Sequence, residues 1–233
     1  MNTVRIFTKP EAYITAVTQP IEKNIHAYLD KYGYPIKEYK SPNDLIELAG
    51  RHCYMSFSNQ ENNPLKTEDF VKNRFKQKHF GLAEHVSFSI ILRGVSRGFT
   101  HEMVRHRLFS FSQASTRYCK PNVFGIVRPK LFDDLPIEYQ NRFIDMAQQQ
   151  YALYDEAMQM FENLPYQTTI KTRRGQARSF LTNMIEAPIY ISGNLRTWHE
   201  MKVKRMIPEA ELEFQAVVTL INSTIKEICN VLD

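Results

Sequence analysis

Apolar and polar residues alternate most regularly between positions 86 and 93. Every second residue there is large and apolar, and this set comprises Val86, Phe88, Ile90 and Leu92. A period of two puts successive side chains on opposite faces of a strand, so the pattern predicts a half-buried strand, central in its sheet. Gly94 closes that strand. Val95, Phe99 and Met103 then recur every fourth residue, which predicts a helix that carries Arg105 at its C-terminal end.

Helical periodicity and helix-end signals recur along the rest of the chain. They predict helices at about 20–32, 41–54, 67–80, 137–164, 194–207 and 209–232. Ser41 before Pro42 is expected to cap the second helix, and Thr67 is expected to cap the third, which Gly81 ends. The side chains expected to face the core are Ile21, Ile25 and Leu29, then Leu45, Ile46, Ala49 and Cys53, then Phe70, Val71, Arg74 and Phe75, then Phe143, Ala147, Tyr151, Tyr154, Met158 and Phe161, and finally Leu212, Ala216, Leu220, Ile228 and Val231 or their near neighbours.

Two more short strands are expected, at about 4–8 and around 189–191, and the polar run 58–64 is expected to be a surface loop. No linker-like or low-complexity stretch divides the chain. Together these elements predict an α+β fold, with residues 1–233 forming a single domain in which several long helices flank a small central sheet. Several helices are apolar on more than one side, which favours contacts between subunits.

Composition narrows the class only slightly. The chain has 233 residues, 43% of them hydrophobic and 24% charged, which is ordinary for a globular protein. A net charge of +5 and a pI near 9.0 favour anionic partners such as nucleotides, folates or nucleic acid. Neither a signal peptide nor a membrane span is evident, so a cytoplasmic location without a membrane partner is expected. The three cysteines are widely spaced, and no metal site is indicated.

The densest candidate chemistry lies between Arg105 and Tyr118, directly after the predicted helix. This stretch, RHRLFSFSQASTRY, holds three arginines and a histidine among four hydroxyl side chains and one amide. Each guanidinium is a planar fork of donors that can grip a phosphate or carboxylate at two points. Arg178, in the second basic cluster RRGQAR, and Arg205 lie further along the chain. The residues alone leave two readings open, an anion-binding site and a solvated basic loop.

The spacing Arg-His-Arg-x-x-Ser-x-x-x-x-Ser-x-Arg, complete from Arg105 to Arg117, resembles the signature of the flavin-dependent thymidylate synthases. The segments HFGLAEH at 79–85, QAR at 176–178 and GNLR at 193–196, and then Arg205, follow the order that this family uses. The resemblance runs from about residue 41 to about residue 214. It implies an enzyme that converts dUMP to dTMP with FAD as hydride carrier, and with 5,10-methylenetetrahydrofolate and NADPH as co-substrates. It also implies a homotetramer with FAD between subunits.

The same resemblance assigns site residues position by position. Arg205 matches the residue that favours ionisation of the pyrimidine N3, the catalytic role. The positions that match FAD contacts are His79, Glu84, Arg105, His106, Arg107, Gln113, Asn194, Arg196 and Glu200. The positions that match dUMP contacts are Glu102, Met103, Val104, Arg105, Gln113, Ala114, Ser115, Thr116, Arg117, Arg178 and Arg205. No metal ligand is implied.

Four positions depart from the family pattern. Gly81 replaces a hydroxyl residue, and the carboxylates of Glu102, Glu200 and Glu209 replace neutral or imidazole side chains. Carboxylates that face a nucleotide weaken its binding. The contacts to FAD are therefore the part of the resemblance that these departures affect most.

Two other function classes compete with a nucleotide-handling enzyme. Phe109, Phe111 and Tyr118 interleave with the arginines, a composition that also stacks on single-stranded nucleic acid. Acidic and basic residues nearly balance along the chain, however, so nucleic acid is not expected as a partner. A thiol enzyme would use Cys119, just after Tyr118, although a small buried residue is the simpler interpretation of a free cysteine.

Overall fold

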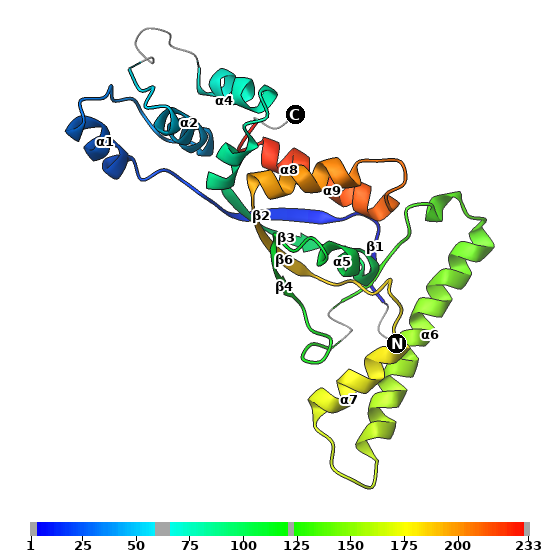
Figure 1. Cartoon of the computed structure of the whole chain (residues 1–233). Helices are drawn as coiled ribbons and strands as arrows, with labels where there is room; N and C mark the ends of the chain where they lie inside the picture. The colour runs from blue at the N-terminus through cyan, green and yellow to red at the C-terminus, as the bar shows by residue number, and fades with distance from the viewer. Residues whose placement is uncertain (1–3, 59–65, 121–123, 231–233) are drawn as a thin grey trace.

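The computed structural model describes residues 4–58, 66–120 and 124–230. Its main sheet has four antiparallel strands in the order β2 (Glu11–Val17), β3 (Ser87–Arg93), β6 (Ile189–Asn194) and β4 (Ser110–Gln113). A second, two-stranded sheet pairs β1 (Ile6–Phe7) in parallel with β5 (Ile126–Val127). Small sheets flanked by helices confirm the α+β class, and β3 is central in its sheet as its alternating pattern predicts (Figure 1).

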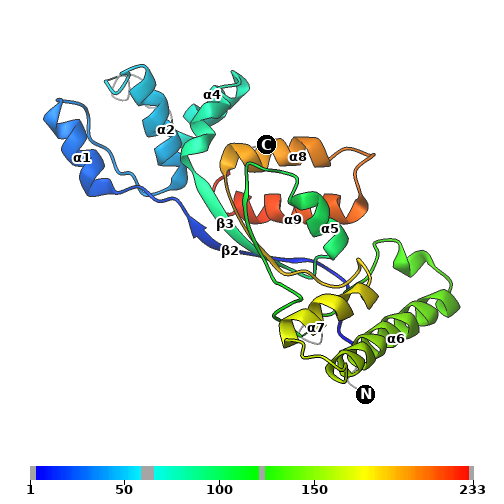
Figure 2. The same ribbon diagram turned by 60° about the horizontal axis from the view of Figure 1, so that its bottom comes forward.

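Three helices cover one face of the main sheet: α5 (Arg97–Met103), α8 (Leu195–Arg205) and α9 (Leu212–Lys226). Figure 2 shows them together on the same side of β2 and β3. Phe88, Ile90 and Leu92 of β3 are fully buried beneath them, and the ring of Phe99 packs on that of Phe214 at 4.8 Å. The main hydrophobic core therefore lies between this face of the sheet and the three helices.

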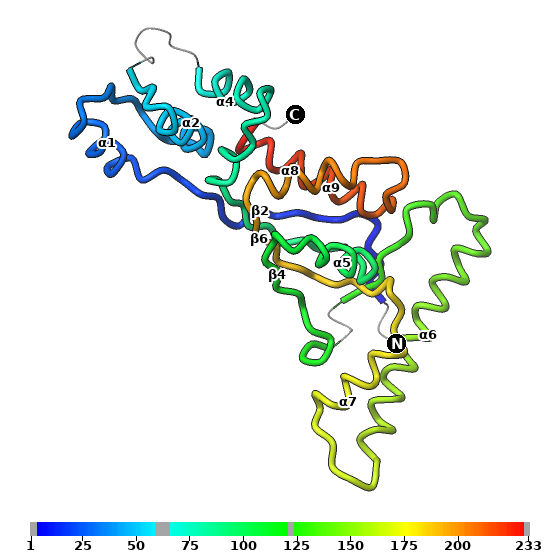
Figure 3. Tube along the Cα trace, viewed as in Figure 1, coloured from blue at the N-terminus to red at the C-terminus, as the bar shows by residue number. Residues whose placement is uncertain are grey.

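The other helices form two projections from this centre. At one end lie α1 (Glu22–Lys31), α2 (Pro42–Cys53) and α4 (Thr67–Lys76), joined to β3 by the 3-10 helix η1 (Phe80–His85). At the other end the short turn η3 (Phe132–Asp134) precedes α6 (Ile137–Glu162), which packs against α7 (Ile170–Ala177) and η4 (Arg178–Phe180). The Cα trace in Figure 3 shows the two projections at opposite ends of the sheet. In the described part of the chain, no helix is long and apolar enough to cross a membrane.

Most predicted helices and strands are confirmed, but β2, β4, α7 and the two-residue strand β5 are not predicted. The periodicity does not predict β2, because its sequence EAYITAV carries polar residues on the face that the sheet leaves partly exposed. It assigns β4 to a polar loop, whereas β4 owes its strand form to pairing with β6, in which Phe111 lies opposite Ile191. The helix α7 is not predicted within the basic cluster, whose charged residues show no apolar periodicity.

Several predicted faces and ends of helices are wrong in detail. Cys53 is exposed, and α2 instead turns Glu47 and Arg51 inward, where they pair with each other. The helix α9 buries Phe214, Val217, Val218, Ile221 and Ile225, whereas Leu212 and Ile228 are exposed. Packing against the sheet, which the local pattern does not contain, decides which stripe is buried.

Two of the predicted helix ends also differ. Thr67 is the first residue of α4 rather than its cap, and its hydroxyl donates to Glu47. The helix ends before Lys78, so Gly81 lies within η1 instead of stopping α4. The cap at Ser41 is confirmed with a complete capping box to Asp44. The predicted loop at 58–64 lies mostly outside the described residues, and Val231 lies wholly outside them.

Candidate active site

The Arg-His-Arg turn follows α5 and is anchored by the aromatic residue after it. Phe109 is buried, and its ring meets Trp198 of α8 edge-on at 4.4 Å. The ring also lies against Gly193, where a Cβ would stand 2.4 Å from its Cδ1. Trp198 in turn donates from its indole nitrogen to the carbonyl of Gly193 at 3.0 Å. Phe109 thereby fixes the turn against the start of α8, a distant part of the sequence.

Arg205, the last residue of α8, lies against this turn. Its Nη1 donates to Oε2 of Glu102 at 2.8 Å, and its Nε donates to Nε2 of His106 at 3.1 Å. The guanidinium carbon stands 4.3 Å above the ring of Phe214, a cation–π contact. Burial lowers the pKa of His106, and the positive charges of Arg205 and Lys204 lower it further, although Glu102 opposes them. The imidazole is therefore held in the neutral form that can accept from Arg205.

A cavity of about 390 Å³ opens between the turn and α8, within the size range of small-molecule sites. Its walls carry four cationic side chains against a single carboxylate. The lining residues are Arg105, His106, Arg107, Leu108, Thr197, Glu200, Met201, Lys204 and Arg205. Such a cavity suits an anionic ligand, because several guanidinium and ammonium groups converge on one partly enclosed space.

The start of α8 brings a second group of predicted residues together. Asn194 is its N-cap and accepts from the backbone and hydroxyl of Thr197 at 2.9 Å. Arg196 lies between two carboxylates, bonding Glu84 of η1 at 2.6 Å and Glu200 at 2.9 Å. These carboxylates raise the pKa of Arg196, with Glu200 the larger cause. Two of the departures from the family pattern therefore form ion pairs with predicted site arginines: Glu200 pairs with Arg196, and Glu102 pairs with Arg205. Glu209 is exposed on the loop before α9.

The second half of the signature lies on a different part of the chain. Beyond β4, residues 114–118 turn against α7: Nη1 of Arg174 donates to the carbonyl of Tyr118, and the ammonium of Lys171 lies 4.6 Å from the ring of Tyr118. Lys171 also lowers the pKa of that phenol. The side chain of Arg117 runs beside Gly175, where a Cβ would stand 3.5 Å from its Nε. Ser115 accepts from the backbone of Arg117 at 3.3 Å.

Apart from Glu84, Asn194 and Arg196 at the start of α8, the structure sorts the predicted residues into two groups and leaves three residues outside them. Arg105, His106 and Arg107 share the cavity with Glu200 and Arg205, whereas the residues near α7 do not line it. The latter are Ala114, Ser115, Thr116, Arg117 and Arg178. Gln113 lies between the groups on β4 and donates to Thr100 of α5 at 3.2 Å.

Three predicted residues stand apart from both groups. Met103 is fully buried in the core, so no part of it is exposed to a ligand. Val104 is exposed, and so is His79, which precedes η1.

Sequence reasoning missed four residues that line the cavity, Leu108, Thr197, Met201 and Lys204, and it missed Phe214, which supports Arg205. Lys204 lines it four residues after Glu200, and that spacing on one helix face was available as a signal. Phe214 forms the platform beneath Arg205, and its ring also lies 5.8 Å from that of His106. No local signal marks Phe214, since the contact joins α9 to the ends of α5 and α8.

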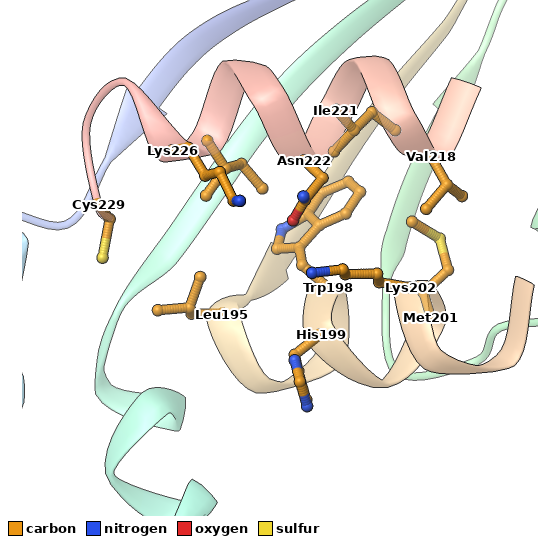
Figure 4. Close-up of a pocket in the computed structure, with 11 residues that line it drawn as sticks. Leu195, Trp198, His199, Met201, Lys202, Val218, Ile221, Asn222, Lys226 and Cys229 are labelled. Atoms are coloured by element: carbon orange, nitrogen blue, oxygen red, sulfur yellow. The ribbon is translucent and has the colours of Figure 1, made fainter. Parts of the chain in front are cut away.

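A narrow space between α8 and α9, shown in Figure 4, explains how α8 is held. Trp198 and Met201 project from α8 toward Val218 and Ile221 of α9. The space measures about 20 Å³, room for roughly one water molecule, so it is a packing seam and not a ligand site. Because α8 is fixed along this seam, Arg205 at its end has a defined position.

Comparisons with known proteins identify the family. The family model described as thymidylate synthase complementing protein matches residues 36–230. The chain is 32% identical over 188 residues to a flavin-dependent thymidylate synthase of Corynebacterium diphtheriae, a match that covers 78% of this chain and 74% of that protein. It is 35% identical over 176 residues to the flavin-dependent thymidylate synthase of Mycobacterium avium, covering 73% and 70%.

Among solved structures, thymidylate synthase X of Helicobacter pylori, determined with FAD and dUMP, superposes with a TM-score of 0.63. That comparison covers 91% of this chain and 92% of the other at 17% identity, and it shows a shared fold. Together the matches define the class as a thymidylate synthase, an enzyme of the methyltransferase type. Within that class the chain belongs to the flavin-dependent family.

Proposed function

We propose that this chain converts dUMP to dTMP by reductive methylation, with 5,10-methylenetetrahydrofolate as carbon donor, FAD as hydride carrier and NADPH as reductant. The observation that carries the proposal is Arg205, held at the edge of a cationic cavity with part of its donor fork unused. The family supplies the reaction, and the geometry supplies a reason why this arginine takes the catalytic role.

The chemistry of Arg205 follows from its surroundings. Methylation at C5 of the pyrimidine requires electron density there, and removal of the N3 proton provides it. A guanidinium beside N3 and its neighbouring oxygen stabilises that anion and lowers the pKa of the N3 proton. The carbon attack then proceeds without a thiol nucleophile. Cys119 is half-buried, and its backbone N–H bonds the carbonyl of Ser115 at 2.9 Å, which agrees with a structural role for this residue.

The donor set also fits the cofactor. FAD carries a diphosphate, and Arg105, Arg107 and Lys204 supply three cations around one cavity. When bound, the flavin supplies the hydride that completes the methyl group. We assign Asn194, Arg196, Glu84 and His79 to the rest of the cofactor site. Glu84 and Glu200 would act there through Arg196, whose orientation they fix.

We further propose a homotetramer with FAD between subunits. In one chain the cavity lies at one end of β4, and the cluster of Ser115, Arg117 and Arg178 lies at the other. A second copy of the chain is needed to bring the cavity of one subunit opposite the cluster of another. The helix α6 supports the assembly with an exposed apolar stripe at every seventh residue. This stripe consists of Tyr139, Met146, Leu153 and Met160.

The test begins with the absorption spectrum of the purified protein, because bound oxidised flavin is yellow and a nucleic-acid binder is colourless. Formation of dTMP from dUMP is then measured with NADPH and methylenetetrahydrofolate. In Arg205→Lys we expect flavin binding to persist and most turnover to be lost, since an ammonium cannot make the planar two-point contact. Arg128→Lys, an arginine that pairs with Asp133 and stacks on the ring of Phe132 outside the site, is the matched control. Near-normal turnover in Arg205→Lys would remove Arg205 from the catalytic role.

A further inference from the structure

Glu102 joins the ends of two helices that the sequence separates widely. It lies in the last turn of α5, and its carboxylate accepts from Arg205 at the last residue of α8. The Glu102 side chain is 40% exposed, and that of Arg205, which lines the cavity, is 23% exposed. A long arginine side chain at a helix end has many rotamers, and each contact that selects one of them removes the others.

The contacts of Arg205 leave a specific part of it available. A guanidinium has five N–H donors. Within the described residues, the recorded hydrogen bonds of Arg205 use one donor on Nε, to His106, and one on Nη1, to Glu102. The face of the group is covered by the ring of Phe214. The remaining N–H groups, one on Nη1 and two on Nη2, form the edge that is left for a substrate.

We propose that Glu102 is a positioning residue for Arg205, acting on the substrate through the guanidinium and not by direct contact. This inference rests on the proposed function, and it changes the role that the family resemblance gives to position 102. The Glu102 carboxylate fixes the rotation of the planar fork about Cδ–Nε while His106 fixes its reach, so that the free edge is aimed at the pyrimidine. A carboxylate beside an N3 anion would repel it, and the bond to Arg205 holds that charge on the far side of the guanidinium.

Three substitutions separate positioning from the alternatives. Glu102→Ala removes the contact, Glu102→Gln keeps a carbonyl oxygen that can accept from Nη1, and Glu102→Asp keeps the charge but withdraws it by one methylene. We expect Ala to lower kcat by about 10- to 100-fold, as a misplaced catalytic group does, with flavin binding and the KM for dUMP little changed. Gln should recover most of the loss, and Asp should remain slow. Asp133→Ala, which breaks the exposed pair of Asp133 with Arg128 at 2.7 Å, is the matched control.

A double-mutant cycle with Arg205→Lys provides the decisive comparison. If Glu102 acts only through Arg205, its replacement by Ala or Asp has little further effect once the fork is gone, and the two losses are strongly non-additive. Additive losses, a Gln variant as slow as Ala, or a raised KM for dUMP at normal kcat would each overturn the inference. Wild-type protein without flavin or dTMP formation would overturn the proposed function instead. The first failure would appear in the variants and the second in the wild-type protein, so the two are distinguishable. Thermal melting of each variant confirms that it is folded.

Discussion

Individual residues in the site act through pairs whose members come from different segments. His106 accepts from Arg205, Glu102 accepts from the same guanidinium, and Arg196 is shared by Glu84 and Glu200. Each pair restricts the rotamers of an arginine side chain, and the family resemblance predicts that this side chain contacts a ligand. Consequently the charge state of one partner affects the geometry of the other.

The imidazole of His106 gives the first prediction at this scale, a pH dependence. Its pKa in the folded protein lies below the ordinary value of about 6.5, owing to burial and to Arg205 and Lys204, with Glu102 opposing. The neutral imidazole therefore contributes its full stabilisation above a pH of about 6.5, the ordinary pKa of histidine. This stabilisation is lost as the pH falls through the lower pKa of His106 in the folded protein. We expect kcat to fall over the same window, because a protonated Nε2 cannot accept from Arg205.

The measurement is a kcat profile from neutral to acidic pH, with thermal melting at each point. In His106→Gln the side-chain carbonyl can accept the hydrogen bond from Arg205, but it does not titrate. We therefore expect lower kcat at every pH, without the fall in kcat at the pKa of His106. An unchanged acidic limb in this variant would assign the titration to another group.

Arg117 gives the second residue-scale prediction. We propose that the cluster beside α7, whose residues match dUMP contacts in the family resemblance, binds the dUMP phosphate. Arg117→Ala and Ser115→Ala should then each weaken dUMP binding by about 1 to 3 kcal/mol, the range for hydrogen bonds to charged groups. Flavin binding should be affected less. Titrations of both ligands measure this, with Arg128→Ala as the control. Equal losses for the two ligands would contradict the division of the site into two groups.

At the scale of elements, α5, α8 and α9 operate as one unit. The N-cap of α5 is Ser96, whose backbone N–H and hydroxyl both donate to Glu213 of α9, at 2.7 and 2.6 Å. Phe214, the next residue, supports Arg205. The helix α9 therefore fixes the start of α5 and the end of α8 at once, and the Arg-His-Arg turn is suspended between them.

Replacing Glu213 tests this coupling. Glu213→Ala leaves two largely buried donors of Ser96 without an acceptor, and we expect a loss of about 1 to 3 kcal/mol in the free energy of unfolding. Burial raises the pKa of Glu213, although Ser96 opposes this, so Glu213→Gln should be much closer to the wild type. Denaturant unfolding measures both variants, with exposed Glu209→Ala as the control. If Ala and Gln are equally destabilised, the charge of Glu213 contributes more than its hydrogen bonds.

At the scale of the whole molecule, the two projections leave apolar surface outside the main core. The stripe of Tyr139, Met146, Leu153 and Met160 is exposed on α6, and it repeats at the spacing of a helix seam. Exposed apolar residues in a continuous row are typical of an interface. The assembly proposed above would cover this row.

A charge placed in that row tests the assembly. Leu153→Glu and Met160→Glu should each shift the protein from tetramer to smaller species, because a carboxylate would have to be buried without a partner. Light scattering after size-exclusion chromatography measures the mass, and the flavin content should fall with it if FAD lies between subunits. Gln148→Glu, which adds the same charge at an exposed polar position on another side of α6, is the control. A tetramer that survives both substitutions would place the interface elsewhere.

The sequence by itself determined the parts whose causes are local. The alternation at 86–93 fixed β3, Gly94 with a φ of +61° closed it, and Ser41 with Asp44 capped α2. The fixed spacing from Arg105 to Arg117 identified the family, because that motif lies within one short segment. These features depend on the residues a few positions away, and a sequence displays those directly.

Only the tertiary structure decided the features that join distant segments. It paired β4 with β6, chose the buried stripe of α9, and brought Glu102, Phe214 and Arg205 to one point. It also placed the two halves of a continuous motif at opposite ends of a strand. A strand separates its ends in space although the sequence keeps them adjacent, while helix packing brings residues far apart in the chain into contact, and neither effect leaves a trace in local periodicity.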